Sequence, residues 1–153
     1  MIKTKIFLSI ILFFFSIINS GNTKINLQIV MKINNQIVTS YDIEQEINYL
    51  LALNSQLSDI NDNQLKQIAK RSITKEIIRK NEILKYKELD YKSSDTEPVI
   101  RALVQSLRLS DQNDLELYLK KFNISIEDLK KKIVIENEWK SLIYSRYIKS
   151  VRI

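Results

Sequence analysis

Apolar residues recur along the chain at spacings that predict a strand pair first and helices afterwards. In residues 28–33, branched apolar residues alternate loosely with polar ones, as in a half-buried strand. The pair Asn34-Asn35 follows, and Asn tolerates the positive φ that a two-residue type I′ turn requires. Residues 36–38 fit a short return strand. We therefore expect an N-terminal β-hairpin that packs against helices, because an isolated hairpin is marginally stable in water.

The segment after the hairpin carries the signals of a helix start. Thr39 is followed three residues later by Asp42, the spacing of a capping box, and Val38 and Ile43 take the two positions of a hydrophobic staple. The residues that follow at helical spacing predict an inward stripe. They are Ile43, Ile47, Leu50, Leu51 and Asn54. Residues 54–63 are rich in Ser, Asp and Asn and predict a loop.

A longer helix is expected from about Asp62 to a point before Lys92. Its inward stripe comprises Leu65, Ile68, Ala69, Ser72, Ile73, Glu76, Ile77 and Leu84. Residues 93–98, Ser-Ser-Asp-Thr-Glu-Pro, then predict a break and a new helix start. They supply polar caps, an acid for the first turn and a proline whose missing N–H does no harm there.

Two short helices and a long one complete the pattern. The first short face consists of Val99, Ala102, Leu103, Ser106 and Leu107, and the second of Leu115, Tyr118, Leu119 and Phe122. Ser125 and Asp128 repeat the capping signal, with Ile124 and Leu129 as the staple. The final helix carries Ile126, Leu129, Ile133, Trp139, Leu142, Ile143 and Tyr147. The predicted fold is mainly α, one domain over residues 27–153, with a small N-terminal β-hairpin followed by about five helices.

The first twenty residues differ from the rest and predict export. Lys3 and Lys5 precede an apolar run at residues 6–18, and a polar stretch follows. This is the layout of a secretory signal peptide, and the run is shorter than the roughly 20 residues that span a bilayer. We expect cleavage near Ser20, so that residues 1–20 form the signal peptide. Ile18 is larger than the residue usual before such a site, which leaves an uncleaved membrane anchor as the alternative.

The residue inventory excludes several classes of site. The chain has no His and no Cys, which excludes the usual zinc sites, Ser-His or Cys-His catalysis and disulfides. Its single glycine, Gly21, excludes glycine-rich phosphate-binding loops. Glu44 with Glu46, and Glu136 with Glu138, are spaced by two residues, so each pair points apart on a helix. We expect neither an enzyme nor a bound cofactor or metal.

The charge balance is weakly basic. The formal net charge of +6 includes Lys3 and Lys5 of the expected signal peptide. Lys and Glu interleave along the predicted helices without a basic block, which is typical of solvated helix faces. Nucleic acid is therefore not an expected partner, and a weak attraction to anionic surfaces stays open.

The order of elements resembles the N-terminal domain of the SurA family of periplasmic chaperones. Three segments carry the resemblance: INNQIVTSYDI at residues 33–43, SITKEIIRKNEILKY at 72–86 and DLKKKIVIENEWKSLI at 128–143. Together with the order of elements, the resemblance covers residues 29–153. It implies an ATP-independent chaperone of the periplasm that binds unfolded polypeptides, outer-membrane proteins above all, through an exposed apolar groove.

The chain also departs from that family. The family normally continues into parvulin-type prolyl-isomerase domains and ends in a strand and helix that complete the N-terminal domain, whereas this sequence stops at Ile153. Parvulin sites use histidines and glycine-containing loops, so the resemblance implies no isomerase activity here. It also implies an uncovered part of the core, with self-association, a separate partner or a longer parent chaperone as the alternatives.

Aromatic side chains suit the binding of unfolded chains, because they offer a large contact area at a small entropic cost. The candidate peptide-binding residues are Tyr49, Tyr86, Tyr118, Phe122, Trp139, Tyr144 and Tyr147. The competing interpretation places such residues in the core, Phe122 and Trp139 foremost. The alternative function is a membrane-tethered interaction or scaffold protein without chaperone activity.

Overall fold

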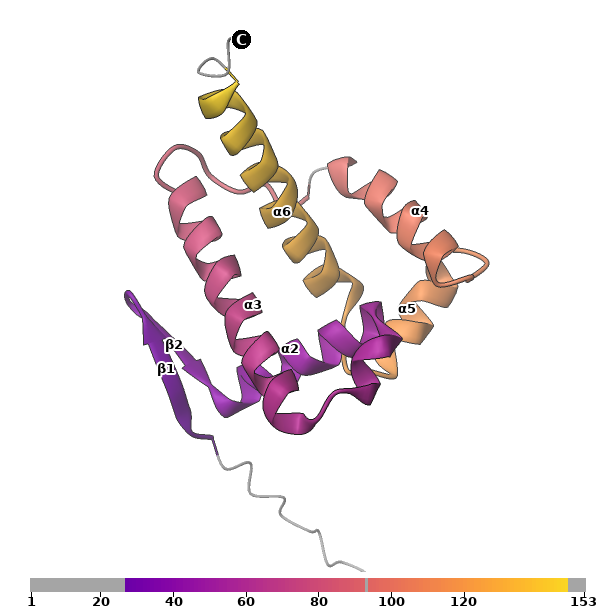
Figure 1. Cartoon of the computed structure of the whole chain (residues 1–153). Helices are drawn as coiled ribbons and strands as arrows, with labels where there is room; N and C mark the ends of the chain where they lie inside the picture. The colour runs from indigo at the N-terminus through magenta and orange to yellow at the C-terminus, as the bar shows by residue number, and fades with distance from the viewer. Residues whose placement is uncertain (1–26, 93, 149–153) are drawn as a thin grey trace, which may run out of the picture.

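The computed structural model describes residues 27–92 and 94–148, which form a mainly helical fold with a small hairpin at the N-terminal side (Figure 1). The strands are β1 (Ile29–Ile33) and β2 (Gln36–Thr39), and the helices are α2 (Ser40–Leu53), α3 (Asp62–Ile83), α4 (Glu97–Ser106), α5 (Gln112–Lys120) and α6 (Ile126–Tyr147). Short 3₁₀ turns lie at Ser55–Asp59 and Ser94–Thr96. The expected fold class is confirmed.

The hairpin pairs β1 with β2 in antiparallel register, with Ile33 opposite Gln36 across a two-residue loop. Asn34 has a φ of 52°, and it is the only one of the two loop residues with positive φ. A type I′ turn needs positive φ at both positions, so that prediction is wrong.

The helix start at Thr39 is confirmed in detail. The Asp42 N–H donates to Thr39 Oγ1 at 3.3 Å, and the Thr39 N–H donates to Asp42 Oδ2 at 2.7 Å, which closes the capping box. At Ser125 the hydroxyl also caps its helix, accepting from the Asp128 N–H at 3.0 Å. The Asp128 carboxylate bonds the Ser125 hydroxyl instead of the backbone N–H, so the expected reciprocal box is not made there.

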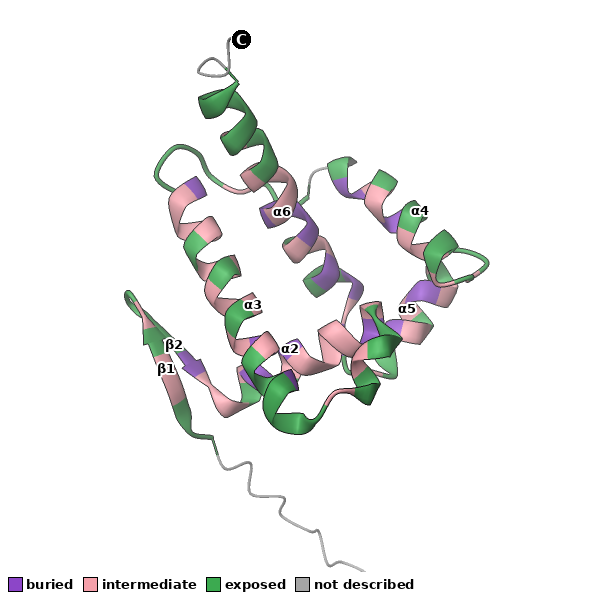
Figure 2. Ribbon diagram, viewed as in Figure 1, coloured by how far each residue is buried: buried purple, intermediate pink, exposed green. Residues whose placement is uncertain are grey.

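Buried apolar residues form two clusters (Figure 2). The bundle cluster joins the end of α2 to α4, α5 and the first turns of α6; its buried members are Ala52, Ile100, Leu115, Leu119, Ile124, Ile126, Leu129 and Ile133. The hairpin cluster joins the hairpin to α2 and α3 through Val38, Ile43 and Ala69. Only α2 supplies buried residues to both clusters.

The predicted faces are partly wrong at α4 and at the end of α3, and Asn54, Ile143 and Tyr147 of two other predicted faces are also exposed. In α4 the buried residue is Ile100, 1% exposed, whereas Ala102 and Ser106 are exposed. The face of α4 that packs on the bundle cluster carries Ile100, Leu103, Val104 and Leu107, and this spacing also fits a helical period. At the end of α3, Ile83 is buried and Leu84 is exposed, because the helix ends there.

The ends of α4 and α5 explain how a chain almost without glycine stops its helices. Arg108 and Asn123 both adopt a φ of 56°, the left-handed conformation usual after a helix. After α4 the Leu109 N–H donates to the Val104 carbonyl at 2.9 Å, and after α5 the Ile124 N–H donates to the Leu119 carbonyl at 3.1 Å. Both ends are Schellman motifs that place an apolar side chain back on the bundle.

The predicted polar caps before α4 are only partly made. Thr96 precedes the helix but makes no side-chain hydrogen bond to its first turn. The acid and the proline fall where they were expected, as Glu97 and Pro98 in the first turn. Proline and charge therefore favour this helix start without a side-chain cap from Thr96.

Candidate functional site

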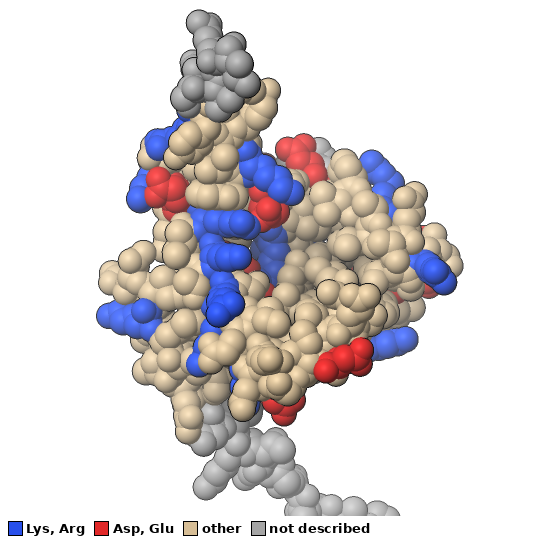
Figure 3. All heavy atoms as spheres, viewed as in Figure 1, with Lys and Arg blue, Asp and Glu red and all other residues tan. Residues whose placement is uncertain are grey.

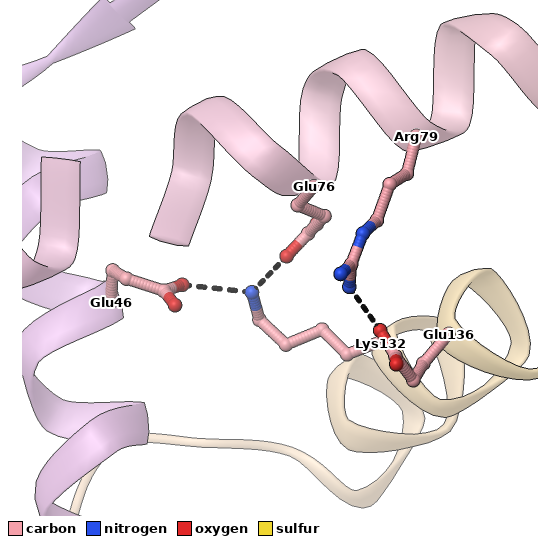
Figure 4. A network of polar contacts seen from close by, with 5 residues as sticks. All are labelled: Glu46, Glu76, Arg79, Lys132 and Glu136. Carbon is pink, nitrogen blue, oxygen red and sulfur yellow. Dashed lines mark hydrogen bonds and ion pairs between the residues drawn. The ribbon is translucent and has the colours of Figure 1, made fainter. Parts of the chain in front are cut away.

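A partly buried ion cluster joins the three longest helices of the described residues. The Lys132 ammonium on α6 donates to Glu46 Oε2 on α2 at 2.8 Å and to Glu76 Oε2 on α3 (Figure 4). The same ammonium lies 4.7 Å from the ring centroid of Tyr49, within cation–π distance. We call Glu46, Glu76 and Lys132 the three-helix cluster. It fixes α2, α3 and α6 to one another by charge-assisted bonds as well as by apolar packing.

The surroundings of the cluster set its protonation. Burial alone lowers the pKa of Lys132, but the Glu76 and Glu46 carboxylates outweigh it and raise that pKa. Burial raises the pKa of the Tyr49 hydroxyl to about 12, although the nearby Lys132 charge opposes the rise. At neutral pH, Lys132 is thus charged and Tyr49 is neutral.

Glu46 is the most deeply placed charge of the cluster, with 4% of its surface exposed. Its Oε1 atom is buried and has no hydrogen-bond partner within the described ranges 27–92 and 94–148. A buried acceptor left unpaired costs about 1–3 kcal/mol, and more when the group is charged. The cluster therefore retains an unused acceptor in the interior.

A cavity of about 450 Å³ opens beside this cluster, bounded by β2, α2, α3 and the start of α6. We call it the hairpin cavity. Its apolar walls include Ile37, Tyr41, Ile73 and Ile77, and Glu46 lies among its lining residues. A volume of this size lies within the range of ligand pockets.

A second cavity of about 310 Å³ shares the three-helix cluster as a wall and continues between α3 and α6. Along it Arg79 pairs with Glu136 and lies 5.8 Å from the Trp139 ring centroid. Figure 3 shows Lys and Arg side chains gathered in a column over α3 and the adjoining part of α6. This column was not evident from the interleaved charges of the sequence.

Helical spacing aligns three basic residues on one side of α3. Arg71, Lys75 and Arg79 are four residues apart on α3 and so lie along one side of it. Arg71 and Lys75 have no ion-pair partner in the part of the chain that the structure describes. This side of α3 is therefore where a weak attraction to anionic surfaces, which the sequence left open, would act.

Four of the seven candidate aromatic residues pack within the fold. Tyr118 donates its hydroxyl to the Ala52 carbonyl at 2.9 Å, and its ring lies 5.3 Å from that of Phe122. Tyr49 and Trp139 are half-buried beside Lys132 and Arg79 respectively. Tyr49 alone of the seven lines the hairpin cavity. These four are in large part structural, and only Tyr49 faces a site.

The other three candidates are exposed at one end of the molecule. Tyr144 and Tyr147 on the last turns of α6 are 67% and 58% exposed, and Tyr86 after α3 is 52% exposed. The Arg146 guanidinium lies 4.1 Å from the Tyr86 ring centroid, which brings Tyr86 next to the end of α6. We call Tyr86, Tyr144, Tyr147 and the exposed Ile148 the terminal patch.

Two members of the terminal patch, Tyr144 and Tyr147, lie on the side of α6 that carries Ile133. Tyr144 and Tyr147 follow Ile133 by eleven and fourteen residues, close to three and four helical turns, so they share its face. Ile133 is buried in the bundle cluster, whereas the last turns of α6 are exposed (Figure 2). The last turns of α6 therefore carry exposed aromatic rings on the side of Ile133, separated from it by the polar Asn137 and Lys140.

The three-helix cluster and its cavity are the features that sequence reasoning missed. Glu76 was placed on an inward stripe, but Glu46 and Lys132 were assigned no role. A signal was present, because Glu46 stands three residues after Ile43 and four before Leu50 and so occupies an apolar face. The position of its cation on a helix more than eighty residues away carried no such signal.

Within the described ranges, no group of acidic side chains is arranged to hold a metal ion. None of the helices there combines the length and hydrophobicity required of a bilayer span. The expected signal peptide and its alternative as an anchor lie outside the described residues.

The chain matches no protein-family model, no curated protein and no solved structure. The resemblance to the SurA N-terminal domain thus stays a prediction from the sequence pattern.

Proposed function

We propose that this chain is an ATP-independent chaperone module of the periplasm that binds unfolded polypeptides, outer-membrane proteins among them. The observation that carries the proposal is the terminal patch, where three tyrosines and an isoleucine are exposed around the last turns of α6. The sequence features that favour export and the SurA-like order of elements supply the compartment and the class of client.

The terminal patch has the chemistry that a holding chaperone requires. Tyr144, Tyr147 and Ile148 are exposed at the end of α6, and Tyr86 is exposed beside Arg146 of the same turns. Full burial of one large apolar side chain is worth about 1.5–3 kcal/mol. An unfolded chain offers apolar side chains that a folded client hides. A protein that binds unfolded chains better than folded ones lowers their free concentration by mass action, and no nucleotide is needed.

The direct test follows the aggregation of a denatured outer-membrane β-barrel protein after dilution from urea, measured by light scattering without nucleotide. We expect the domain to suppress scattering in proportion to its concentration. Scattering that is equal with and without the domain rejects the proposal and leaves the scaffold alternative.

A variant pair locates the binding surface. Tyr144→Ser combined with Tyr147→Ser removes two exposed rings of the terminal patch, and we expect at least about a tenfold weaker suppression. Ile78→Ser combined with Leu117→Ser removes two comparably exposed apolar residues outside the patch and serves as the control. If both variants lose the same activity, the patch is not the binding surface.

The proposed export to the periplasm is tested separately. Mass spectrometry of the protein purified from an exporting host determines its first residue. A chain that begins near Gly21 or Asn22 supports export with cleavage, and an intact Met1 with membrane fractionation supports the tethered alternative.

A further inference from the structure

The hairpin cavity combines apolar walls with an excess of negative charge. Four carboxylates line it, Asp42, Glu46, Glu76 and Asp128, against the two ammonium groups of Lys131 and Lys132. Both ammonium groups are already engaged: Lys131 pairs with Asp128 at 2.9 Å and Lys132 with Glu46 and Glu76. The cavity is therefore complementary to an additional cation.

Glu46 supplies a specific acceptor for that cation. Its Oε2 is used by Lys132, while Oε1 is buried and without a hydrogen-bond partner among the described residues. A guanidinium or ammonium group that donates to Oε1 would satisfy an acceptor which the fold leaves unpaired, and hydrogen bonds between charged groups are the stronger kind.

The rim of the cavity determines what can accompany the cation. Ile37 and Tyr41 line the cavity and are 55% and 46% exposed, so they present apolar surface at its opening. Long basic side chains have an apolar stem below a charged head, and the stem packs on apolar walls while the head reaches the carboxylate.

We propose that the hairpin cavity receives an arginine or lysine side chain of an unfolded polypeptide, with Glu46 as its acceptor and Ile37 and Tyr41 in contact with the apolar neighbours of that residue. This inference rests on the proposed chaperone function and names a preference in its clients, segments in which a basic residue stands between apolar ones. The terminal patch, which has no carboxylate among its members, takes the apolar segments of the same client.

The test uses the purified chain and three short fluorescent peptides that differ at one central position between two leucines: Arg, Gln and Glu. We expect the Arg peptide to bind about tenfold more tightly than the Gln peptide and the Glu peptide to bind most weakly. Equal affinity for the three peptides would overturn the proposal.

Two matched variants assign the effect to one carboxylate. Glu46→Gln keeps the size of the side chain and removes its charge, and we expect it to abolish the preference for Arg over Gln. Glu44→Gln removes an exposed charge two residues away on the same helix, and we expect the preference to remain. A Glu46→Gln protein that folds and still prefers Arg would show that Glu46 is not the acceptor and would overturn the proposal.

A second measurement needs no folded Glu46 variant. Nuclear magnetic resonance of the unmodified domain should show that the Arg peptide shifts the amides of Ile37, Tyr41 and Ile73, whereas shifts confined to the terminal patch contradict the proposal. The failures are distinguishable. A domain that suppresses aggregation without any Arg preference retains the proposed function and loses this inference, whereas a domain that neither suppresses aggregation nor binds any peptide loses both.

Discussion

Removal of the Lys132 ammonium should be among the most costly single changes in this chain. In Lys132→Met the side chain keeps its approximate length, but Glu46, 4% exposed, loses the only cation that pairs with it among the described residues. At 2.8 Å and an effective dielectric constant near 20, the direct attraction between the two charges is about 6 kcal/mol. Desolvation of both groups offsets much of that attraction in the native protein, and the net cost of truncating one partner of a buried pair is about 3–5 kcal/mol.

We expect the lower end of this range, about 3 kcal/mol, because Lys132 keeps 22% of its side chain in contact with solvent. Urea unfolding followed by circular dichroism measures the change. With a slope of about 1.5 kcal/mol per molar urea, the midpoint should fall by about 2 M.

A double variant distinguishes a stranded charge from a packing defect. Lys132→Met with Glu46→Leu removes both charges, and we expect stability within about 1 kcal/mol of the unmodified domain, because a buried pair is often replaceable by apolar residues. Lys131→Met, next in sequence and in an exposed pair with Asp128, is the control and should leave the midpoint unchanged. A small loss in Lys132→Met, or a double variant whose loss equals the sum of the single losses, would refute this account of the cluster.

Three further outcomes follow from the fold. Ile100→Ala should lower the free energy of unfolding by about 2–5 kcal/mol in the same urea assay, whereas Ser106→Ala on the exposed side of α4 should change it little; similar losses would contradict the observed face. Thr39→Ala removes the cap of α2 and should cost about 1 kcal/mol, measured as a lower melting temperature, and an unchanged value would mean that water replaces the capping box. Burial raises the pKa of Tyr49 from 10.0 to about 12, so the folded state holds this proton more tightly than the unfolded state does. The resulting contribution to stability is complete below pH 10 and is lost as the pH rises through 12. Tyr49→Phe should therefore make the fall in the free energy of unfolding between pH 10 and 12 less steep, by up to about 1.4 kcal/mol per pH unit, and identical falls in both proteins would contradict the assignment.

Local signals in the sequence predicted the elements well. The Thr39–Asp42 box, the cap at Ser125 and the hairpin each depend on residues within a few positions of one another, and all three are present in the structure. The prediction failed where two helical faces competed. In α4, a face through Ala102 and a face through Ile100 both fit the period, and the choice depends on where α5 and α6 lie.

The candidate site was less accessible to sequence reasoning for a related reason. The sequence does not reveal that Tyr144 is exposed and Tyr118 packed, because both are aromatic residues at helical spacing. The positions of the neighbouring helices decide between the two. The cluster of Glu46 with Lys132 joins residues 86 positions apart, a pairing that no local pattern encodes. Periodicity thus predicts helices and their capped ends, whereas long-range charge pairing requires the fold.

The position of α2 has a mechanical consequence. Its first turn supplies Ile43 to the hairpin cluster and its last turn supplies Ala52 to the bundle cluster. This one helix of 14 residues therefore connects the two clusters. The hairpin cluster has three buried members and the bundle cluster has eight, so local opening of the hairpin side costs less free energy. Local opening of the hairpin side would widen the hairpin cavity next to β2, while the bundle cluster keeps its packing.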